Sequence, residues 1–265
     1  MIRVERGISK WVGAADYSGL GHGHAPGGAQ DRFSFRLANQ LIGNVPGATA
    51  LEFALAPAVM VVEKTCRVVV GGAPVEIEID GQSAPEWTVL EVPSGAQVSV
   101  RMGAFGCRFY LAVAADSEAA VVGRTRVEGT EDWAPDPGTV RVLAGPESDP
   151  AALEALCGRP WQVGLQSSGM GLVLEGEPLD LPGYDLLSAP VQDGTIQATA
   201  NGLLALLRER GTLGGYPRVA TVIDCDVDRL AQFRPGETLR FQLVDRDDAR
   251  GFCELQERAL DAALG

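Results

Sequence analysis

Histidine and lysine are nearly absent from this chain of 265 residues. The two histidines, His22 and His24, stand two residues apart in a glycine-rich stretch, so they cannot share one face of a helix as a metal-binding pair would. We interpret both as solvated loop side chains and predict neither histidine-based catalysis nor a metal site. Lysine occurs only at Lys10 and Lys64, a bias toward arginine that we attribute to genomic base composition.

The 5 cysteines are few, odd in number and without a C-x-x-C spacing. This usage argues against a disulfide framework and a zinc site, and for a reducing compartment. No apolar run approaches the about 20 residues that a membrane helix needs, and residues 1–6 lack the apolar stretch of a secretory signal. The sequence therefore predicts a cytoplasmic protein with no membrane partner.

Positive charge is also scarce, and the formal net charge is −13. A polyanion would be repelled at long range and no basic run offsets the repulsion, which excludes nucleic acid as an expected partner. The chain has no Walker A motif, no dinucleotide fingerprint and no G-x-S-x-G. Gly19-Leu20-Gly21-His22-Gly23 lacks the downstream context of a phosphate loop and is interpreted as an ordinary loop.

What the chain does contain indicates β-structure. Short β-branched segments fill residues 66–102 and are separated by glycine-containing turns. Val75–Ile79 alternates with period two, which predicts one buried face and one face carrying carboxylates. Asp80-Gly81 follows it and is typical of a type I′ hairpin turn. With a further strand at 107–115 and more strands after residue 140, the spacing favours barrels or sandwiches.

Few helices are expected, and the chain divides into two lobes. Asp31 can cap a helix over 31–44, and Asp149 precedes a proline that opens another. The predicted helices span 31–44, 149–160, 226–233 and 252–264. A polar, Pro- and Gly-rich stretch is the predicted connection between the lobes. The expected organisation is an N-terminal lobe over 1–122, a connection over 123–139 and a C-terminal lobe over 140–265.

Five segments, in order along nearly the whole chain, carry a resemblance to a known family. They are GGAQDRFSFRLANQLIGN (27–44), ATALE (48–52), MGLVLEG (170–176), LLSAPVQDGTIQ (186–197) and GGYPRVATVIDCDVDRLAQFRPGETLRF (214–241). Together they resemble the family of the 5-oxoprolinase C subunit, also called the KipI antagonist or allophanate hydrolase subunit 2 family. The resemblance implies a mostly β fold of two cyclophilin-like β-barrel lobes, with a cleft where segments of both meet.

The same resemblance implies an activity and partners. Members act with a KipI-like B subunit, joined for 5-oxoproline by an A subunit, and open 5-oxoproline to glutamate at the expense of ATP. Fused homologues serve as the carboxyltransferase part of biotin-dependent urea carboxylase, which would require a biotin carrier. Both activities imply a small amide-like substrate. A third alternative is a non-catalytic partner that regulates a KipI-like protein.

Several positions depart from the family pattern. Gly169 stands where the family has arginine, and Leu172 where it has tyrosine. Residues 209–213 replace the D-x-Q-T-T that precedes G-G-Y-P, and ATANGLLALL (198–207) has lost an aspartate and two prolines. These changes lie inside motifs, so they favour a changed substrate or the regulatory alternative.

Three residues are candidate catalytic groups: Asp31, Glu52 and Tyr216. Asp31 is either a helix cap or a group that orients water or a substrate nitrogen. Glu52, in an apolar strand, either points outward or is buried with a partner, in which case a raised pKa would suit acid–base work. Tyr216 either offers its phenol or ring to a ligand or closes a turn.

The candidate substrate-binding residues are Gln197, Gly214, Gly215, Arg218 and Arg32. The two glycines of G-G-Y-P are expected to adopt positive φ and let a substrate approach the backbone, or else to form a simple hairpin corner. Arg218 could hold a carboxylate or phosphate in bidentate fashion, or be a solvated strand residue. The Gln197 amide could bind a urea-like group, or Gln197 could simply belong to the sheet surface.

Overall fold

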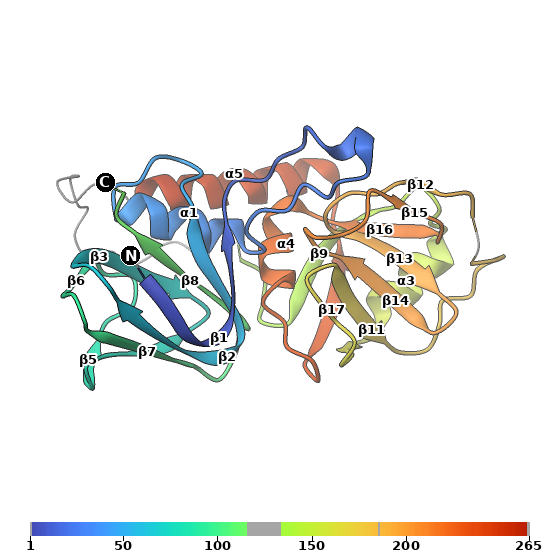
Figure 1. The fold of residues 1–265 in the computed structure, drawn as a ribbon. Coiled ribbons are helices and arrows are strands. Elements are labelled where there is room, and N and C mark those ends of the chain that lie inside the picture. The colour runs from blue at the N-terminus through green and yellow to red at the C-terminus, as the bar shows by residue number, and fades with distance from the viewer. Residues whose placement is uncertain (1, 116–133, 185, 264–265) are drawn as a thin grey trace. The chain divides into compact units, whose positions relative to one another are not determined.

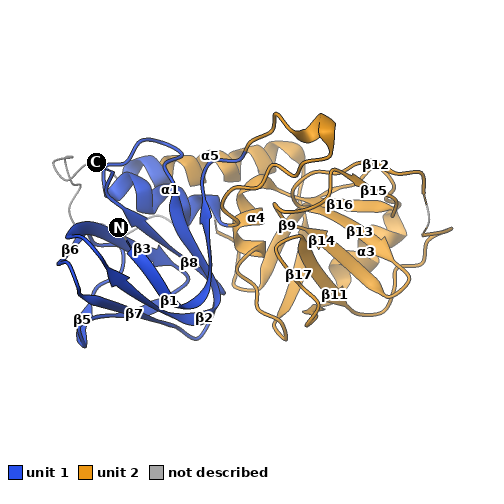
Figure 2. Cartoon of the chain, viewed as in Figure 1, with its two compact units in different colours: residues 1–15, 31–128, 259–265 blue, residues 16–30, 129–258 orange. Residues whose placement is uncertain are grey.

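The structure, a computed structural model, describes residues 2–115, 134–184 and 186–263. The chain forms two compact units (Figure 2): the first comprises residues 1–15, 31–128 and 259–265, and the second comprises 16–30 and 129–258. Most of the predicted connection over 123–139 lies outside the described residues, and the predicted lobe boundaries stay predictions. No helix among the described residues combines the length and apolarity needed to cross a membrane.

The first unit is an eight-stranded sheet with one helix on it (Figure 1). Its order is β5-β4-β7-β2-β8-β3-β6, and β1 pairs with β2. The helix, α1 (Arg32–Leu41), packs against β3 and β8. The strands are β1 (Ile2–Val12), β2 (Ala50–Val62), β3 (Cys66–Gly72), β4 (Val75–Ile79), β5 (Gln82–Ala84), β6 (Leu90–Val92), β7 (Gln97–Met102) and β8 (Arg108–Val113).

Strand β4 shows how alternation builds this sheet. Val75 and Ile77 are buried in the apolar core of the unit, while Glu76 and Glu78 point outward. Both carboxylates pair with Arg101 on β7, at 2.8 and 3.1 Å. The turn to β5 has φ of 50° at Asp80 and 78° at Gly81, so the predicted type I′ geometry is confirmed.

The second unit is a closed barrel of order β10-β11-β14-β13-β16-β9-β17. Strand β17 closes it by pairing antiparallel with β10 and parallel with β9. A two-stranded sheet, β12 (Ala189–Pro190) with β15 (Leu213–Gly214), lies off the barrel. The barrel strands are β9 (Thr139–Ala144), β10 (Trp161–Val163), β11 (Gly171–Glu175), β13 (Thr195–Thr199), β14 (Gly202–Leu206), β16 (Arg218–Val222) and β17 (Thr238–Leu243).

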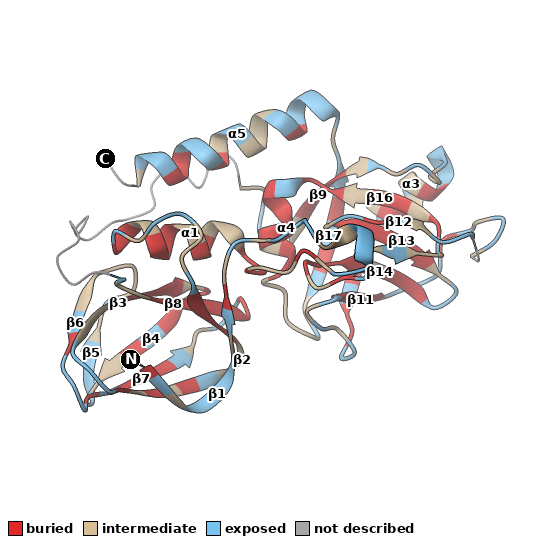
Figure 3. Ribbon diagram, turned by 45° about the horizontal axis from the view of Figure 1, so that its top comes forward, coloured by how far each residue is buried: buried red, intermediate tan, exposed pale blue. Residues whose placement is uncertain are grey.

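Two helices begin directly after the capping residues that the sequence predicts. Asp31 accepts a hydrogen bond from the Ser34 backbone N–H at 2.9 Å, and Asp149 accepts one from Ala152 at 2.7 Å, which confirms both predicted starts. Figure 3 shows the buried side of α1. The helices of the second unit are α3 (Pro150–Gly158), α4 (Asp224–Leu230) and most of α5 (Arg246–Ala262), preceded by the 3-10 turn η1 (Leu20–His22).

The last helix begins earlier than the predicted residue 252. Its first turn is capped by Asp245, whose Oδ1 accepts hydrogen bonds from the backbone N–H groups of Asp247 (2.9 Å) and Asp248 (2.8 Å). The polar first turn carries no apolar periodicity, so only its cap could have indicated it. Mostly β structure with two barrel-like sheets and a few helices is thus confirmed for the described chain.

Candidate functional site

Glu52 is a carboxylate in the core of the first unit. It lies on β2 between Lys10 of β1 and Tyr110 of β8, because the strand register places both directly opposite it. Its side chain is 3% exposed. Tyr110 donates its phenolic O–H to Oε2 at 2.8 Å, and Lys10 Nζ lies 3.2 Å from Oε1. Of the two placements that the sequence leaves open, the structure has the buried, partnered one.

Tyr110 connects Glu52 to the start of α1. The backbone N–H of Asp31 donates to the phenolic oxygen at 2.8 Å, while the Asp31 carboxylate is occupied as the cap. Burial, with the nearby charges of Glu52 and Asp31, raises the pKa of Tyr110 well above its ordinary value. Tyr110 is therefore a neutral donor at physiological pH, and two of the predicted catalytic residues are joined through it.

Arg108 and Lys10 give this site its positive charge. Arg108 Nε is 4.0 Å from Glu52 Oε1, and its Nη1 donates to Cys107 Sγ at 3.0 Å. Lys10 is the more accessible cation, with 39% of its side chain exposed against 9% for Arg108. The group holds a carboxylate in a fixed orientation between cations and a neutral phenol. We call Glu52, Tyr110, Lys10 and Arg108 the carboxylate site.

A second group forms around G-G-Y-P in the second unit. Gln197 on β13 is buried and donates from Nε2 to the backbone oxygen of Tyr216 at 3.3 Å. A Cβ on Gly214 would lie 2.3 Å from that same Nε2. Tyr216 itself is 42% exposed. The structure thus brings together Gln197, Gly214 and Tyr216, which we call the amide site.

The expected positive φ at Gly214 and Gly215 is wrong. Neither residue is among the glycines of positive φ, and Gly214 lies in strand β15, opposite Ala189. A Cβ at Gly214 would meet the Gln197 amide, so a larger residue there would force that side chain to move. The carbonyl oxygen of Gly215 accepts a hydrogen bond from the Leu186 N–H at 2.7 Å.

Arg218 already forms an ion pair within its own chain, with the carboxylate of Glu147. Its Nε donates to Glu147 Oε2 at 2.8 Å, its backbone N–H to the same oxygen at 2.9 Å, and Nη1 to the carbonyl of Pro190 at 3.0 Å. The hydrogen bond from Arg218 lowers the pKa of Glu147. A substrate anion would have to displace Glu147. Arg32, the first residue of α1, is half-buried in the first unit, with Asp31 and Glu52.

A buried polar group in the second unit was missed by the sequence analysis. Gln30 donates to the carbonyl of Gly169 at 2.9 Å and accepts from the backbone of Arg208 at 3.2 Å. Arg208 is 1% exposed and donates to Asp228 at 2.7 Å. A Cβ on Gly169 would lie 2.2 Å from the Glu209 carboxylate, so Glu209 occupies space at the position where the family has arginine.

Comparison with known proteins identifies the class of this two-unit fold. The family model described as carboxyltransferase domain, subdomain A and B, matches residues 22–126 and 118–243. The chain therefore belongs to that family.

Comparisons with two individual proteins show this similarity in more detail. The 5-oxoprolinase C subunit of Escherichia coli (strain K12) is 28% identical over 273 residues, which cover 87% of this chain and 86% of that protein. The crystal structure of TTHA0988 superposes with a TM-score of 0.80 at 28% identity, over 91% of this chain and 55% of that one.

A third comparison bears on the fold alone. The crystal structure of the K. lactis urea amidolyase superposes with a TM-score of 0.83 at 19% identity and covers 98% of this chain. The chain spans 20% of that much longer protein. The same fold therefore also occurs as a segment of a longer protein.

Proposed function

We propose that the chain is the C subunit of a 5-oxoprolinase-type complex that opens 5-oxoproline to glutamate with ATP. It would act with a KipI-like B subunit, together with an A subunit, in the cytoplasm. The observation that carries the proposal is the match to a 5-oxoprolinase C subunit over most of both chains. The superposition on urea amidolyase, in contrast, covers only 20% of that protein.

The two polar groups supply chemistry suited to a lactam. In the amide site, the Gln197 side chain is fixed by its bond to the Tyr216 carbonyl, and the exposed Tyr216 phenol is available to a ligand. In the carboxylate site, Glu52 is held in place by Tyr110 and Lys10. We assign Tyr216 to contact with the substrate, Glu52 to an acid–base or orienting role, and Asp31 to an orienting role. Nucleotide binding is assigned to the assembled complex.

The test is reconstitution. The chain is co-expressed with its KipI-like partner, the complex is isolated by size exclusion, and the A subunit is added before 5-oxoproline-dependent phosphate release and glutamate formation are measured. Turnover that needs all three proteins would support the proposal. A stable complex that hydrolyses no ATP with 5-oxoproline would refute it.

Two variants assign the sites within that assay. Tyr216→Phe and Glu52→Gln are expected to enter the complex and to lower turnover by about 100-fold, the size of a typical acid–base contribution. Tyr17→Phe, which alters another tyrosine with half its surface exposed, is the matched control and should keep full turnover. Wild-type rates in both site variants would remove the site assignment and leave the family membership intact.

A carboxyltransferase function is the second candidate. The description of the matching family favours it. In that case the chain would move a carboxyl group between a biotin carrier and a urea-like acceptor. Carboxybiotin-dependent carboxylation of urea, measured with a carboxylated carrier domain, distinguishes it from ATP-driven lactam opening.

A regulatory role without catalysis is the third candidate. It is favoured by the changed motif at Gly169, where the Glu209 carboxylate lies against the glycine. The expected result is then a complex with the KipI-like protein that changes that protein's activity, with neither 5-oxoproline nor urea turned over.

A further inference from the structure

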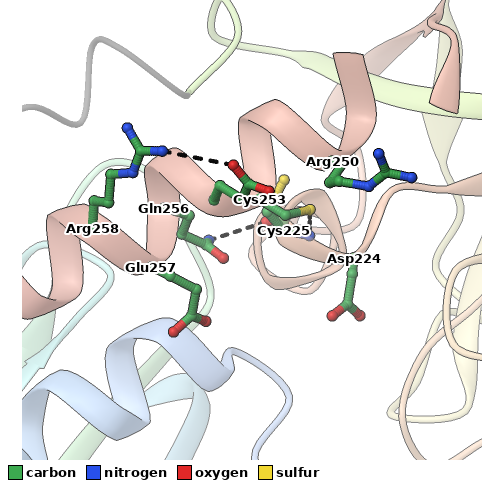
Figure 4. Close-up of a pocket in the computed structure, with 8 residues that line it drawn as sticks. Asp224, Cys225, Arg250, Cys253, Gln256, Glu257 and Arg258 are labelled. Carbon is green, nitrogen blue, oxygen red and sulfur yellow. Dashed lines mark hydrogen bonds and ion pairs between the residues drawn. The ribbon is translucent and has the colours of Figure 1, made fainter. Parts of the chain in front are cut away.

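Two cysteines far apart in sequence meet between α4 and α5 in the second unit. The backbone N–H of Cys225, in the first turn of α4, donates to Sγ of Cys253 on α5 at 3.4 Å (Figure 4). The two side chains also share a small apolar cluster that includes Ile223 and Ala249. The pair is thus held by packing on both helices as well as by the hydrogen bond.

Both cysteines line a pocket of about 420 Å³. Cys225 is buried at 2% exposure, whereas Cys253 is half-buried. An approaching reagent therefore reaches Cys253 first. The pocket is lined by Asp224, Cys225, Arg250, Cys253, Glu254, Gln256, Glu257 and Arg258 (Figure 4).

The two thiols differ in acidity. The side-chain interaction with Cys225 lowers the pKa of Cys253 to about 7. The hydrogen bond from the Cys225 backbone N–H acts in the same direction, while burial and the charges of Asp224 and Asp226 oppose it. The side-chain interaction with Cys253, together with burial, raises the pKa of the Cys225 thiol. Charged groups face the pair from β9, α4 and α5: Arg141, Asp224, Asp226, Arg250 and Glu254.

The other three cysteines lack these features. Cys107 is buried, and its sulfur accepts a hydrogen bond from Arg108. Burial raises the pKa of Cys66 and of Cys157. Among the described cysteines, a lowered pKa and access therefore coincide at Cys253, and Cys225 lies next to it.

We propose that Cys253 and Cys225 form a redox-modification site, in which Cys253 is the reactive thiol and Cys225 the resolving thiol. The co-reactant is a small disulfide of the glutathione class. This inference does not depend on the proposed function.

The chemistry takes place in two exchanges. The Cys253 thiolate attacks one sulfur of the small disulfide, forming a mixed disulfide and releasing one small thiolate. Cys225 then loses its proton to that thiolate or to solvent and attacks the Cys253 sulfur, releasing the second small thiol. The two cysteines give up two electrons, the small disulfide takes them, and the product is a Cys225–Cys253 disulfide between α4 and α5.

The first test is alkylation of the full chain by iodoacetamide near neutral pH, followed by peptide mass mapping. A thiol of lowered pKa is far more ionised at this pH than an ordinary cysteine, although its thiolate is intrinsically less nucleophilic. Cys253 should therefore be alkylated about 5- to 10-fold faster than Cys66 or Cys157. Equal rates at the three positions would overturn the proposal.

The second test uses oxidised glutathione as the probe. The wild-type chain should yield a Cys225–Cys253 cross-linked peptide that a dithiol reductant removes. Cys225→Ala should stop at a glutathione adduct on Cys253 and should slow alkylation of Cys253, because the thiol that lowers its pKa is gone. Cys66→Ser is the matched control and should behave as the wild type. A wild-type chain that accumulates the adduct without the cross-link would contradict the resolving role of Cys225.

Discussion

At the residue scale, one buried side chain joins two of the predicted catalytic residues of the first unit. Tyr110 accepts from the Asp31 backbone and donates to Glu52, so its single hydroxyl serves a helix start and a buried carboxylate at once. Its raised pKa keeps the hydroxyl protonated, and a protonated phenol can make both bonds. Tyr110 is accordingly a positioning residue for the Glu52 carboxylate and for the backbone of Asp31 at the helix start.

Tyr110→Phe should destabilise the protein by about 1–3 kcal/mol, because Asp31 and Glu52 each lose a buried hydrogen bond. Urea unfolding followed by circular dichroism measures the change. Tyr17→Phe, at a tyrosine that is half exposed, is the control and should cost less than Tyr110→Phe. Equal stability of Tyr110→Phe and the wild type would show that the phenol does not bridge the two groups.

Gly214→Ala tests the amide site at the same scale. The new methyl would lie 2.3 Å from Gln197 Nε2, so the amide must move and its bond to Tyr216 must break. We expect a loss of about 1–3 kcal/mol by overpacking, with reduced turnover of the assembled complex. Gly21→Ala is the control, because a Cβ there meets nothing within 4 Å. If Gly214→Ala keeps wild-type stability and turnover, the close approach is not what requires glycine.

At the element scale, an ion pair ties the segment after β9 to the start of β16. Glu147 binds both the backbone and the guanidinium of Arg218. The folded-state pKa of Glu147 lies below its ordinary value of 4.5. The pair therefore stabilises the fold fully above that value, and the stabilisation is lost as pH falls through the lowered folded-state pKa.

The stability difference between wild type and Glu147→Gln should therefore shrink on acidification below about pH 4.5. Glu86 gives a control of opposite sign, because burial raises its pKa. The wild type should lose stability relative to Glu86→Gln as pH rises through the folded-state value. Unfolding free energies from urea titrations at several pH values test both slopes, and a Glu147→Gln difference that does not vary with pH would contradict the pairing.

The elements also show how far the sequence alone can reach. Asp31 and Asp149 cap their helices through bonds three residues away, so local pattern was enough to predict both starts. Glu52 and Tyr110 are separated by 58 positions and meet only through strand register, which no local pattern reveals. The close approach at Gly214 has the same origin, since the Gln197 amide comes from another strand. Family resemblance pointed to Glu52 and Gln197, but the structure was needed to find their partners.

At the scale of the whole molecule, the described chain has two large apolar cores, one in each unit. In the first unit, the Phe53 ring stacks on Phe109 with centroids 4.8 Å apart. In the second, Leu174 lies inside the barrel with Trp161 and Phe241. Phe53 and Leu174 are each fully buried. Units with their own cores are expected to behave as separate cooperative domains.

Phe53→Ala should cost about 3–5 kcal/mol and Leu174→Ala about 2–5 kcal/mol, by lost burial and the cavity left behind. Native-state hydrogen exchange, resolved by peptide mass spectrometry, assigns the loss to a unit. Phe53→Ala should lower protection in β2, β7 and β8 and leave β11, β13 and β14 unchanged; Leu174→Ala should do the reverse. The paired variants control for each other, because each reports on the unit that the other leaves intact. Equal loss in both units from either substitution would mean that the chain unfolds as one cooperative body and would contradict the expectation of separate domains.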